Sequence, residues 1–311
     1  MRIISAAEVE AALDYPSLVE RLRQAFRREI DVPLRHHHDM ETAGGGTATL
    51  LLMPAWQAGQ HIGVKMVTIF PDNGEKSLPA VMGIYVLLDG KTGSPLALID
   101  GPTLTVRRTA AASALASSYL SRPDAERLLM VGTGALAPQL IMAHAAVRPI
   151  CNVLIWGRDP EKAKKLAKRL TRTDFRVDWT THLEEAARGA HVISCATLSK
   201  EPLIRGDWLQ PGQHVDLVGA FRPDMRESDD EALRRARVFV DTRAGATTEG
   251  GDIVQAVAAG ALSLDDIAGD LVELTRGERS GRRYYDQITL FKSVGTAIED
   301  LAAAQLVFER R

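Results

Sequence analysis

The fold is decided by the stretch Leu128-Leu129-Met130-Val131-Gly132-Thr133-Gly134-Ala135-Leu136-Ala137. Four apolar residues predict a buried strand, the two glycines predict a tight turn, and the residues after them predict the first turn of a helix. Gly132 permits the turn, Gly134 lets a ligand approach the backbone, and Ala137 is the small residue where helix and strand pack. N–H groups at a helix N-terminus bind phosphate. The residues predicted to bind the pyrophosphate of a dinucleotide are therefore Gly132, Thr133, Gly134, Ala135, Leu136 and Ala137.

Downstream of this stretch, apolar runs alternate with helical patterns. Strands are predicted at Leu128–Val131, Val153–Trp156, Phe175–Trp179, Val192–Ala196, Val215–Val218 and Val238–Asp241. Helical stretches such as Pro160–Leu170 and Leu183–Arg188 separate most of them. Strands joined by helical crossovers form a parallel sheet, so the predicted fold class is α/β, with a six-stranded Rossmann doubly wound sheet.

More than a hundred residues precede the glycine turn, and their pattern predicts a separate α+β domain. Two helices follow Ser5 and Asp14, and a longer one runs from about Thr103 to Leu120. Strands are predicted at Thr47–Met53, Ile62–Phe70, Val81–Asp89 and Pro95–Asp100. The last helix, Thr296–Arg311, could close either domain, and the pattern alone leaves this open. A chain of 311 residues suits two domains.

Composition argues against several classes of partner. The net charge is −2 and no basic tract is sustained, so neither nucleic acid nor an anionic membrane is expected. No apolar run reaches the roughly 18 residues of a membrane span, and the N-terminus lacks a signal-peptide core. Cys151 and Cys195 are the only cysteines, too few for a disulfide framework. These features predict a cytoplasmic protein.

Lys65 interrupts an apolar pattern. Alternate residues of an extended run share one face, so Lys65 sides with Gly63, Val67 and Ile69. A buried lysine needs a partner and its pKa moves easily, which suits proton transfer or anion binding. A lysine that snorkels at an exposed edge gives the same pattern, so both interpretations stay open.

Arg108 is a second charge in small and apolar surroundings. Its neighbours four residues away on the predicted helix are Leu104 and Ala112. A guanidinium there indicates a clamp for a carboxylate, which it matches bidentately, and a structural salt bridge is the alternative. Arg107 is expected to be the solvent-facing member of the pair.

The run His36-His37-His38-Asp39 suggests a metal site at first sight. Consecutive residues of an extended segment point to opposite faces, so three in a row do not readily bind one ion. We therefore predict surface histidines and no metal.

The segment Trp156-Gly157-Arg158-Asp159-Pro160 follows the second Rossmann strand, where the nucleotide is selected. Enzymes that use NAD usually place an acidic residue there, whereas an arginine accommodates the 2′-phosphate of NADP. Asp159 followed by Pro160 is typical of a helix N-cap with proline at N1. Arg158 therefore favours NADPH, with NADH as the alternative.

Together these residues resemble the ornithine cyclodeaminase/mu-crystallin family along nearly the whole chain. The motifs that carry the resemblance are Gly63-Val64-Lys65 with Val67-Thr68, Arg107-Arg108-Thr109-Ala110-Ala111, residues 132–137, Val218-Gly219-Ala220 with Arg222-Pro223-Asp224, and Phe291-Lys292-Ser293-Val294-Gly295 with Glu299-Asp300. The resemblance implies a substrate-binding and dimerisation domain, residues 1–122 with 296–311, beside an NAD(P)-binding domain, residues 123–295. It also implies a homodimer that acts on small amino or imino acids.

The resemblance also implies roles for individual residues. Arg35, Lys65 and Arg108 should bind the substrate carboxylate, and Lys65 is the candidate for proton transfer. The residues expected near the nicotinamide are Thr197, Val218, Gly219, Lys292, Ser293 and Gly295.

One position departs from the cyclodeaminase pattern. Those enzymes carry an aspartate two residues after the glycine that matches Gly219, and this chain has Phe221 there. The tract is closer to mu-crystallin and the ketimine reductases, so the expected function is NADPH-dependent reduction of pyrroline-2-carboxylate or piperideine-2-carboxylate to proline or pipecolate, within proline metabolism. The alternatives are an alanine-dehydrogenase-like activity, ornithine cyclodeamination with Asp224 as the replacement base, and a non-catalytic protein that binds NADPH and a small ligand.

Overall fold

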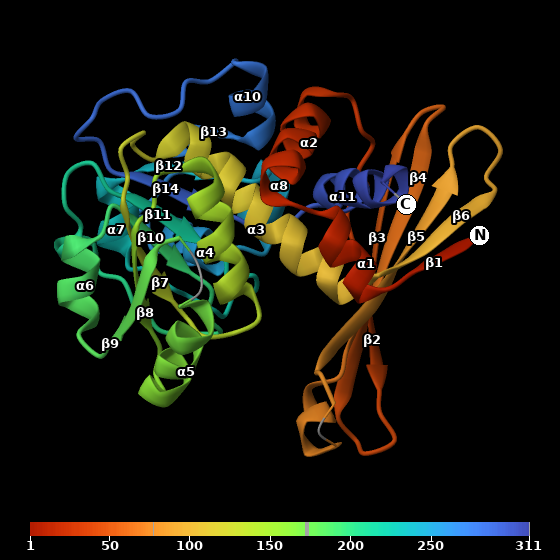
Figure 1. Ribbon diagram of the computed structural model, residues 1–311, viewed down its shortest axis with the longest axis horizontal. Coiled ribbons are helices and arrows are strands. Elements are labelled where there is room, and N and C mark those ends of the chain that lie inside the picture. The colour runs from red at the N-terminus through yellow and green to blue at the C-terminus, as the bar shows by residue number, and fades with distance from the viewer. Residues whose placement is uncertain (77, 172–173, 311) are drawn as a thin grey trace. The chain divides into compact units, whose positions relative to one another are not determined.

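The computed structural model describes residues 1–76, 78–171 and 174–310, and the chain divides into two units (Figure 1). Unit 1 comprises residues 1–109 and 296–311, of which Arg311 lies outside the described residues. Unit 2 comprises residues 110–295. The division falls inside helix α3 (Gly101–Leu120), whereas the boundary expected from the sequence follows this helix.

Unit 1 is built on one sheet with the order β1-β6-β5-β4-β3-β2. Its strands are β1 (Arg2–Ile4), β2 (His36–Glu41), β3 (Thr47–Gln57), β4 (His61–Ile69), β5 (Val81–Asp89) and β6 (Pro95–Asp100), and the short 3₁₀ helix η1 (Pro71–Lys76) follows β4. Neighbours from β2 to β6 pair antiparallel, and β1 joins β6 in parallel. Apolar alternation predicted β3 to β6. It did not predict β1, which has three residues, or β2, which is mostly polar and whose six residues are all exposed.

The first two helices begin where side chains satisfy the free N–H groups of their first turns. Helix α1 (Ala6–Ala12) begins with the predicted capping box of Ser5 and Glu8. Helix α2 (Tyr15–Arg27) follows Asp14, whose carboxylate accepts a hydrogen bond from the N–H of Ser17. The apolar side chains of α2 are buried at the four-residue spacing expected of a helix that packs on one face.

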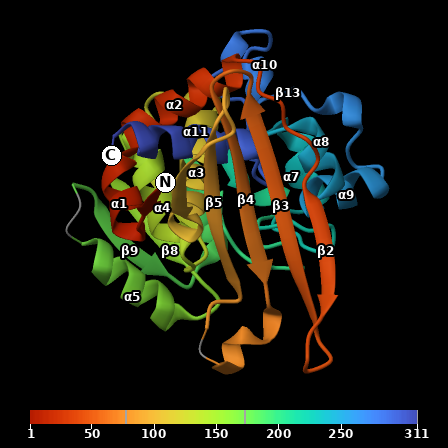
Figure 2. The same ribbon diagram turned by 90° about the vertical axis from the view of Figure 1, so that its right-hand side faces the viewer.

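The C-terminal helix α11 (Ala297–Glu309) belongs to unit 1, which answers the question that its pattern left open. All its residues from Ala297 to Val307 are buried, so the helix is enclosed on every side. It packs against α2 and crosses one face of β3, β4 and β5. In Figure 2 it passes behind these strands, and the face toward the viewer carries no helix of the described part of unit 1.

Unit 2 is a doubly wound sheet of parallel strands, which confirms the predicted α/β fold class. Its order among the described residues is β13-β12-β14-β11-β10-β7-β8-β9. The strands are β7 (Arg127–Val131), β8 (Asn152–Trp156), β9 (Arg176–Thr180), β10 (Val192–Cys195), β11 (His214–Leu217), β12 (Arg237–Val240), β13 (Gly269–Asp270) and β14 (Thr289–Lys292). The predicted count of six was wrong, because the short strands β13 and β14 join the sheet and β14 separates β11 from β12.

Helices connect these strands. They are α4 (Leu136–Val147), α5 (Pro160–Leu170), α6 (Leu183–Gly189), α7 (Asp230–Arg235), α8 (Arg243–Thr248), α9 (Gly251–Ala258) and α10 (Leu271–Arg276), with 3₁₀ turns η2 (Gly206–Trp208) and η3 (Leu264–Asp266). Apolar residues of the central strands and of the helices from α6 to α9 form one buried core. Within the described residues, no helix is long and apolar enough to cross a membrane.

A buried carboxylate lies within this sheet. Asp216 of β11 accepts hydrogen bonds from Ser113 Oγ at 2.9 Å and Ser194 Oγ at 2.7 Å, and its Oδ2 lies 3.1 Å from His144 Nε2. Burial raises the pKa of Asp216, but the hydrogen bonds of His144 and Ser194 outweigh it and hold the pKa below its ordinary value. The network satisfies an otherwise costly charge in the core.

Candidate active site

The glycine turn has the geometry that a dinucleotide phosphate requires. Gly132 has a φ of 123°, and a Cβ there would lie 2.5 Å from the carbonyl oxygen of Ala196, so only glycine fits. A Cβ on Gly134 would meet nothing within 4 Å, which leaves open space over the turn. Helix α4 begins directly afterwards at Leu136, and Ala137 is fully buried against the sheet. These residues fit a phosphate held at a helix N-terminus.

The other positions expected at the cofactor follow neighbouring parallel strands. Thr197 follows β10, Val218 and Gly219 follow β11, and Ser293 follows β14. Because β14, β11, β10 and β7 are adjacent and parallel, these residues meet the glycine turn at the carboxyl edge of the sheet. This edge is where doubly wound sheets bind their ligands.

Glu227 links two of these strand ends and was not predicted. Its Oε1 accepts hydrogen bonds from the N–H of Thr197 at 2.7 Å and from Thr197 Oγ1 at 2.8 Å. Its Oε2 accepts the N–H of Gly219 at 2.7 Å. Glu227 is fully buried, and burial raises its pKa to about 7, with Lys292 opposing the shift and Asp252 adding to it.

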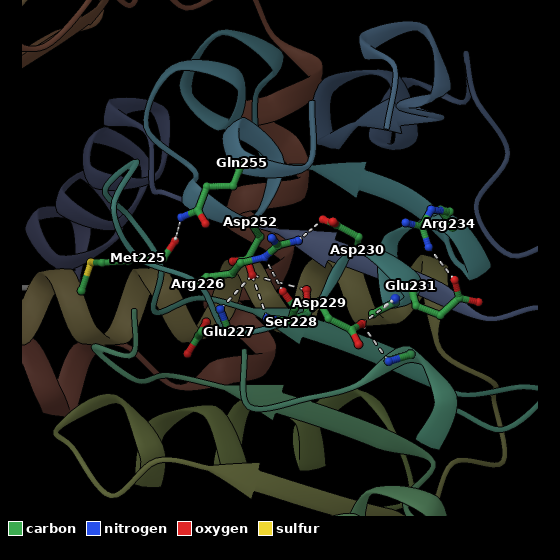
Figure 3. Close-up of polar contacts among 12 residues, drawn as sticks. Met225, Arg226, Glu227, Ser228, Asp229, Asp230, Glu231, Arg234, Asp252 and Gln255 are labelled. Carbon is green, nitrogen blue, oxygen red and sulfur yellow. Dashed lines mark hydrogen bonds and ion pairs between the residues drawn. The ribbon is translucent and has the colours of Figure 1, made fainter. Parts of the chain in front are cut away.

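A second unpredicted residue, Asp252 of α9, fixes the segment that carries Glu227 (Figure 3). Its Oδ1 accepts the N–H groups of Glu227 and Ser228, both at 2.9 Å. Its Oδ2 lies 3.2 Å from the ammonium of Lys292, and both side chains are fully buried. Lys292, expected near the nicotinamide, is thus an ion-pair partner within unit 2, and its contact with a cofactor stays a prediction.

Asp241 holds the turn after β14 in a similar way. Its Oδ2 accepts the N–H groups of Val294 at 2.8 Å and Gly295 at 2.7 Å. Buried carboxylates that bind backbone N–H groups keep a turn in one conformation, because each bond is charge-assisted. Ser293 and Gly295 therefore lie in a fixed turn, and Asp241 is a third supporting carboxylate that the sequence analysis did not identify.

The predicted substrate residues come together in unit 1. Lys65 Nζ of β4 lies 2.9 Å from Oδ1 and 2.8 Å from Oδ2 of Asp300 on α11. Arg108 of α3 contacts the same carboxylate through Nε at 2.9 Å and contacts Glu299 through Nη1 at 2.5 Å. Lys65 and Arg108 are only 2% and 4% exposed, and both carboxylates are fully buried. The alternative of an exposed edge lysine is therefore wrong.

Electrostatics tie Arg35 to the same cluster. Burial lowers the pKa of Lys65 to about 8, the charges of Arg108 and Arg35 act in the same direction, and Asp300 opposes them. Burial raises the pKa of Asp300, but Arg108, Lys65 and Arg35 outweigh it, so the pKa of Asp300 is lowered. The charges of three cations, Lys65, Arg108 and Arg35, thus act on the one carboxylate of Asp300.

Two neighbours of this cluster add to the picture. Tyr85 of β5 lies opposite Lys65 in the sheet register and is 1% exposed, and its hydroxyl has no hydrogen-bond partner among the described residues. Arg107, expected to face solvent, is only 14% exposed. Arg107 is the more exposed of the pair, since the Arg108 side chain is 5% exposed, but it is largely covered: Glu10 lies 3.0 Å from its guanidinium and the ring of Tyr15 lies 5.2 Å from it. Arg108, by contrast, makes the salt bridge that was the structural alternative to a ligand clamp.

The remaining residues singled out from the sequence lie at the surface or cap a helix. Asp159 caps α5 by accepting the N–H of Glu161 at 3.0 Å, as predicted, and Arg158 is exposed. His36, His37 and His38 are exposed on β2, and no group of metal ligands occurs among the described residues.

The tract after Gly219 is also exposed. Phe221 is 40% exposed. Asp224 pairs with Lys200 at 3.0 Å and Arg222 at 3.1 Å on the surface, which is a poor setting for a replacement base.

Known proteins resemble this chain from end to end. The profile of the ornithine cyclodeaminase/mu-crystallin family matches residues 1–311. Delta(1)-pyrroline-2-carboxylate reductase of Colwellia psychrerythraea is 40% identical over 315 residues, covering 100% of this chain and 99% of that protein.

Two solved structures share the fold. Delta(1)-pyrroline-2-carboxylate reductase of Thermococcus litoralis, in complex with NADH and L-proline, has a TM-score of 0.93 and 32% identity, covering 100% of this chain and 97% of that chain. An archaeal alanine dehydrogenase dimer with bound NAD has a TM-score of 0.91 and 30% identity, covering 99% and 95%. Similarity of this extent, in sequence and in fold, shows that the chain belongs to the ornithine cyclodeaminase/mu-crystallin family.

Proposed function

We propose that this protein reduces a small cyclic imino acid, pyrroline-2-carboxylate or piperideine-2-carboxylate, to proline or pipecolate with NADPH. The observation that carries the proposal is the buried cluster in which Lys65 and Arg108 share the carboxylate of Asp300. Lysine and arginine side chains bind a carboxylate through charge-assisted hydrogen bonds, which suits a substrate with a single carboxylate. Relatives named for pyrroline-2-carboxylate reduction, at 40% and 32% identity, support the same reaction.

In this proposal the cluster binds and protonates the substrate. Arg35 and Arg108 bind the carboxylate and thereby fix the orientation of the imine carbon. Lys65 donates a proton to the imine nitrogen, since its pKa of about 8 keeps the ammonium protonated at neutral pH yet makes it a better acid than an exposed lysine. Asp300 keeps the ammonium in place at 2.8 Å. A nicotinamide held at the carboxyl edge of the unit 2 sheet would supply the hydride, and this hydride with the proton from Lys65 would convert the C=N bond into an amine.

The cofactor residues are part of the proposal. The turn from Gly132 to Ala137 would hold the pyrophosphate, and the strand ends at Thr197, Gly219 and Ser293 would lie along the nicotinamide side. Arg158, exposed after β8, would bind the 2′-phosphate and favour NADPH over NADH.

We also propose a homodimer, formed through the face of the unit 1 sheet opposite α11. Strand alternation places Ile62, Val64 and Met66 on the side away from Lys65, and Met82 and Ile84 of β5 extend this side. Met82 is 37% and Ile84 is 42% exposed, so apolar surface remains uncovered. The alanine dehydrogenase of similar fold is a dimer.

Both cysteines are free thiols, which fits the proposed cytoplasmic location.

An absorbance assay at the nicotinamide band tests the proposal. Purified protein is mixed with NADPH and either cyclic imino acid, or with pyruvate and ammonia, and ornithine is tested with oxidised cofactor. We expect rapid oxidation of NADPH with the cyclic imines and little ammonia from ornithine, because Phe221 can neither accept a proton nor orient water. Faster turnover of pyruvate with ammonia would favour an alanine dehydrogenase. Proline and ammonia from ornithine at a rival rate would favour a cyclodeaminase, and binding of NADPH without any turnover would favour a binding protein.

A further inference from the structure

The segment between β11 and α7 is fastened to α9 by several side chains (Figure 3). Asp252 accepts hydrogen bonds from the N–H groups of Glu227 and Ser228, and Gln255 donates one hydrogen bond to the carbonyl of Met225 at 3.0 Å. A Cβ on Gly251 would lie 1.9 Å from the same Met225 oxygen, so helix and segment touch at backbone level. Glu227 is therefore held at its backbone before its side chain makes any contact.

From this fixed backbone the carboxylate of Glu227 reaches the ends of two adjacent strands. It binds both the N–H and the hydroxyl of Thr197, and it binds the N–H of Gly219. The two strand ends are in close contact, since a Cβ on Gly219 would lie 2.1 Å from the carbonyl oxygen of Thr197. Three short hydrogen bonds to one buried carboxylate fix their relative position.

The support for this carboxylate is unusual for a core. Lys292 is the only cation for which a pair with Asp252 is seen among the described residues, at 3.2 Å. The charge of Lys292 also acts on Glu227, so one buried ammonium serves two fully buried carboxylates. An apolar cluster of similar shape would often be at least as stable, so stability alone does not account for these charges.

We propose that Glu227 is a positioning residue for the nicotinamide cofactor: it locks Thr197 and Gly219 into the conformation that receives the cofactor, and the Lys292–Asp252 pair holds it in place. The inference rests on the proposed cofactor position at the carboxyl edge of the unit 2 sheet. It assigns to Glu227 no contact with the substrate and no part in proton transfer.

The protonation state of Glu227 provides a readout that a purely structural role would not move. The titratable groups that act on it or that it acts on are Lys292 of β14, Asp252 of α9 and Cys195 of β10. Burial raises the pKa of Glu227 to about 7. Protonation puts a hydrogen on an oxygen that faces an N–H or hydroxyl donor, which loosens the clamp. Cofactor affinity should therefore fall as the pH decreases through 7.

The test compares Glu227→Gln with a matched control, Asp216→Asn. The glutamine is nearly isosteric, but its amide turns a donor toward either Thr197 or Gly219. Asp216 is an equally buried carboxylate of the same sheet, and it binds Ser113, Ser194 and His144 instead of the strand ends at the cofactor edge. Thr197→Val, which removes only the hydroxyl bond, is the milder variant.

The first measurement is the Kd of NADPH by fluorescence between about pH 6 and pH 8, the range in which a carboxylate with a raised pKa titrates. The second is the midpoint of urea unfolding of the cofactor-free protein. The third is hydrogen exchange of peptides spanning residues 195–200 and 217–221. For Glu227→Gln we expect about a tenfold or greater rise in Kd, faster exchange in both peptides, and loss of the wild-type pH dependence of Kd. Thr197→Val should raise Kd by about threefold.

Asp216→Asn should lower the unfolding midpoint while it leaves the NADPH Kd within about twofold of wild type. The proposal is overturned if Glu227→Gln binds NADPH normally, or if Asp216→Asn weakens binding equally at the same loss of stability. Should Glu227→Gln fail to fold, an unchanged Kd in Thr197→Val overturns the proposal as well. A wild-type protein that binds NADPH but reduces no imine refutes the proposed reaction and leaves this test intact.

Discussion

The chemistry proposed for Lys65 follows from its buried surroundings. Its ammonium is buried against Asp300 at 2.8 Å, and burial with the charges of Arg108 and Arg35 lowers its pKa to about 8. The shift changes an ordinary cation into an acid that can exchange its proton near neutral pH.

We predict that Lys65→Met lowers kcat/KM for the imino acid by about a hundredfold or more, which corresponds to about 2.7 kcal/mol, while the Kd of NADPH changes little. In the wild type, kcat/KM should fall as the pH rises through about 8, because the neutral amine can no longer donate a proton. This descending limb should be absent from the variant. Steady-state kinetics from pH 6 to 10 check both points, and near-normal kinetics in Lys65→Met would leave the residue with a structural role only.

We predict that NADPH binds at least about tenfold tighter than NADH, a difference of about 1.4 kcal/mol, which is modest for one charge-assisted phosphate contact. Arg158→Gln should bring the two affinities close together. Lys162→Gln, a charge removed from the exposed face of α5, is the control and should keep the preference. Fluorescence titration with both cofactors decides the matter, and an equal or tighter NADH affinity in the wild type would refute the assignment of Arg158.

At this scale the sequence indicated some residues and not others for a physical reason. Lys65 and Arg108 stand out because each places a charge in an apolar pattern, and a pattern is visible without a structure. Glu227 lies in a polar stretch of the sequence and Asp252 follows two glycines, and the partners of both are backbone N–H groups brought near by the fold. Nearly every residue type carries a backbone N–H, so the sequence does not reveal which residue such a carboxylate will bind.

Among the elements, α11 decides the charge of the proposed substrate site. It contributes Glu299 and Asp300 in its first turn, where carboxylates also favour the positive end of the helix. Its sequence is apolar or small on nearly every face, so periodicity could not say which sheet it covers.

We predict that Asp300→Asn destabilises the protein by about 3–5 kcal/mol, because removing one partner of a buried ion pair leaves uncompensated charge in the core. Urea unfolding measures the change. The control is Glu184→Gln on α6, which removes an exposed ion pair with Arg188 and should change stability by about 0.5 kcal/mol or less. Equal effects of the two substitutions would contradict the role given to the Asp300 cluster.

Some strands, like some site residues, could be predicted from the sequence and others could not. Strands β7 to β12 were predicted because each is an apolar run followed by a helical pattern or a turn. Strand β14 has four residues and ends in Lys292, a side chain that a short apolar run does not suggest. Its burial depends on Asp252 from another element, so the strand could be recognised only once the sheet is assembled.

At the scale of the whole molecule, the open face of the unit 1 sheet predicts assembly. We expect a mass near twice the 33.8 kDa of one chain by light scattering. Ile84→Lys should yield monomers, because it places a charge in the middle of the apolar face of β5. Leu154→Lys, at a similarly exposed apolar position on β8 of unit 2, is the control and should remain dimeric. A dimeric Ile84→Lys variant would place the interface elsewhere.

The position of α11 in the chain has a consequence for synthesis on the ribosome. Residues 1–109 emerge first, but the helix that covers their sheet and supplies Glu299 and Asp300 emerges only after all of unit 2 has been made. Until then Lys65 and Arg108 lack their carboxylate partners, and one face of the sheet lacks the helix that packs on it. The first unit to be started is thus the last to be finished, and a nascent chain arrested before Thr296 would display an unfinished core to chaperones and proteases.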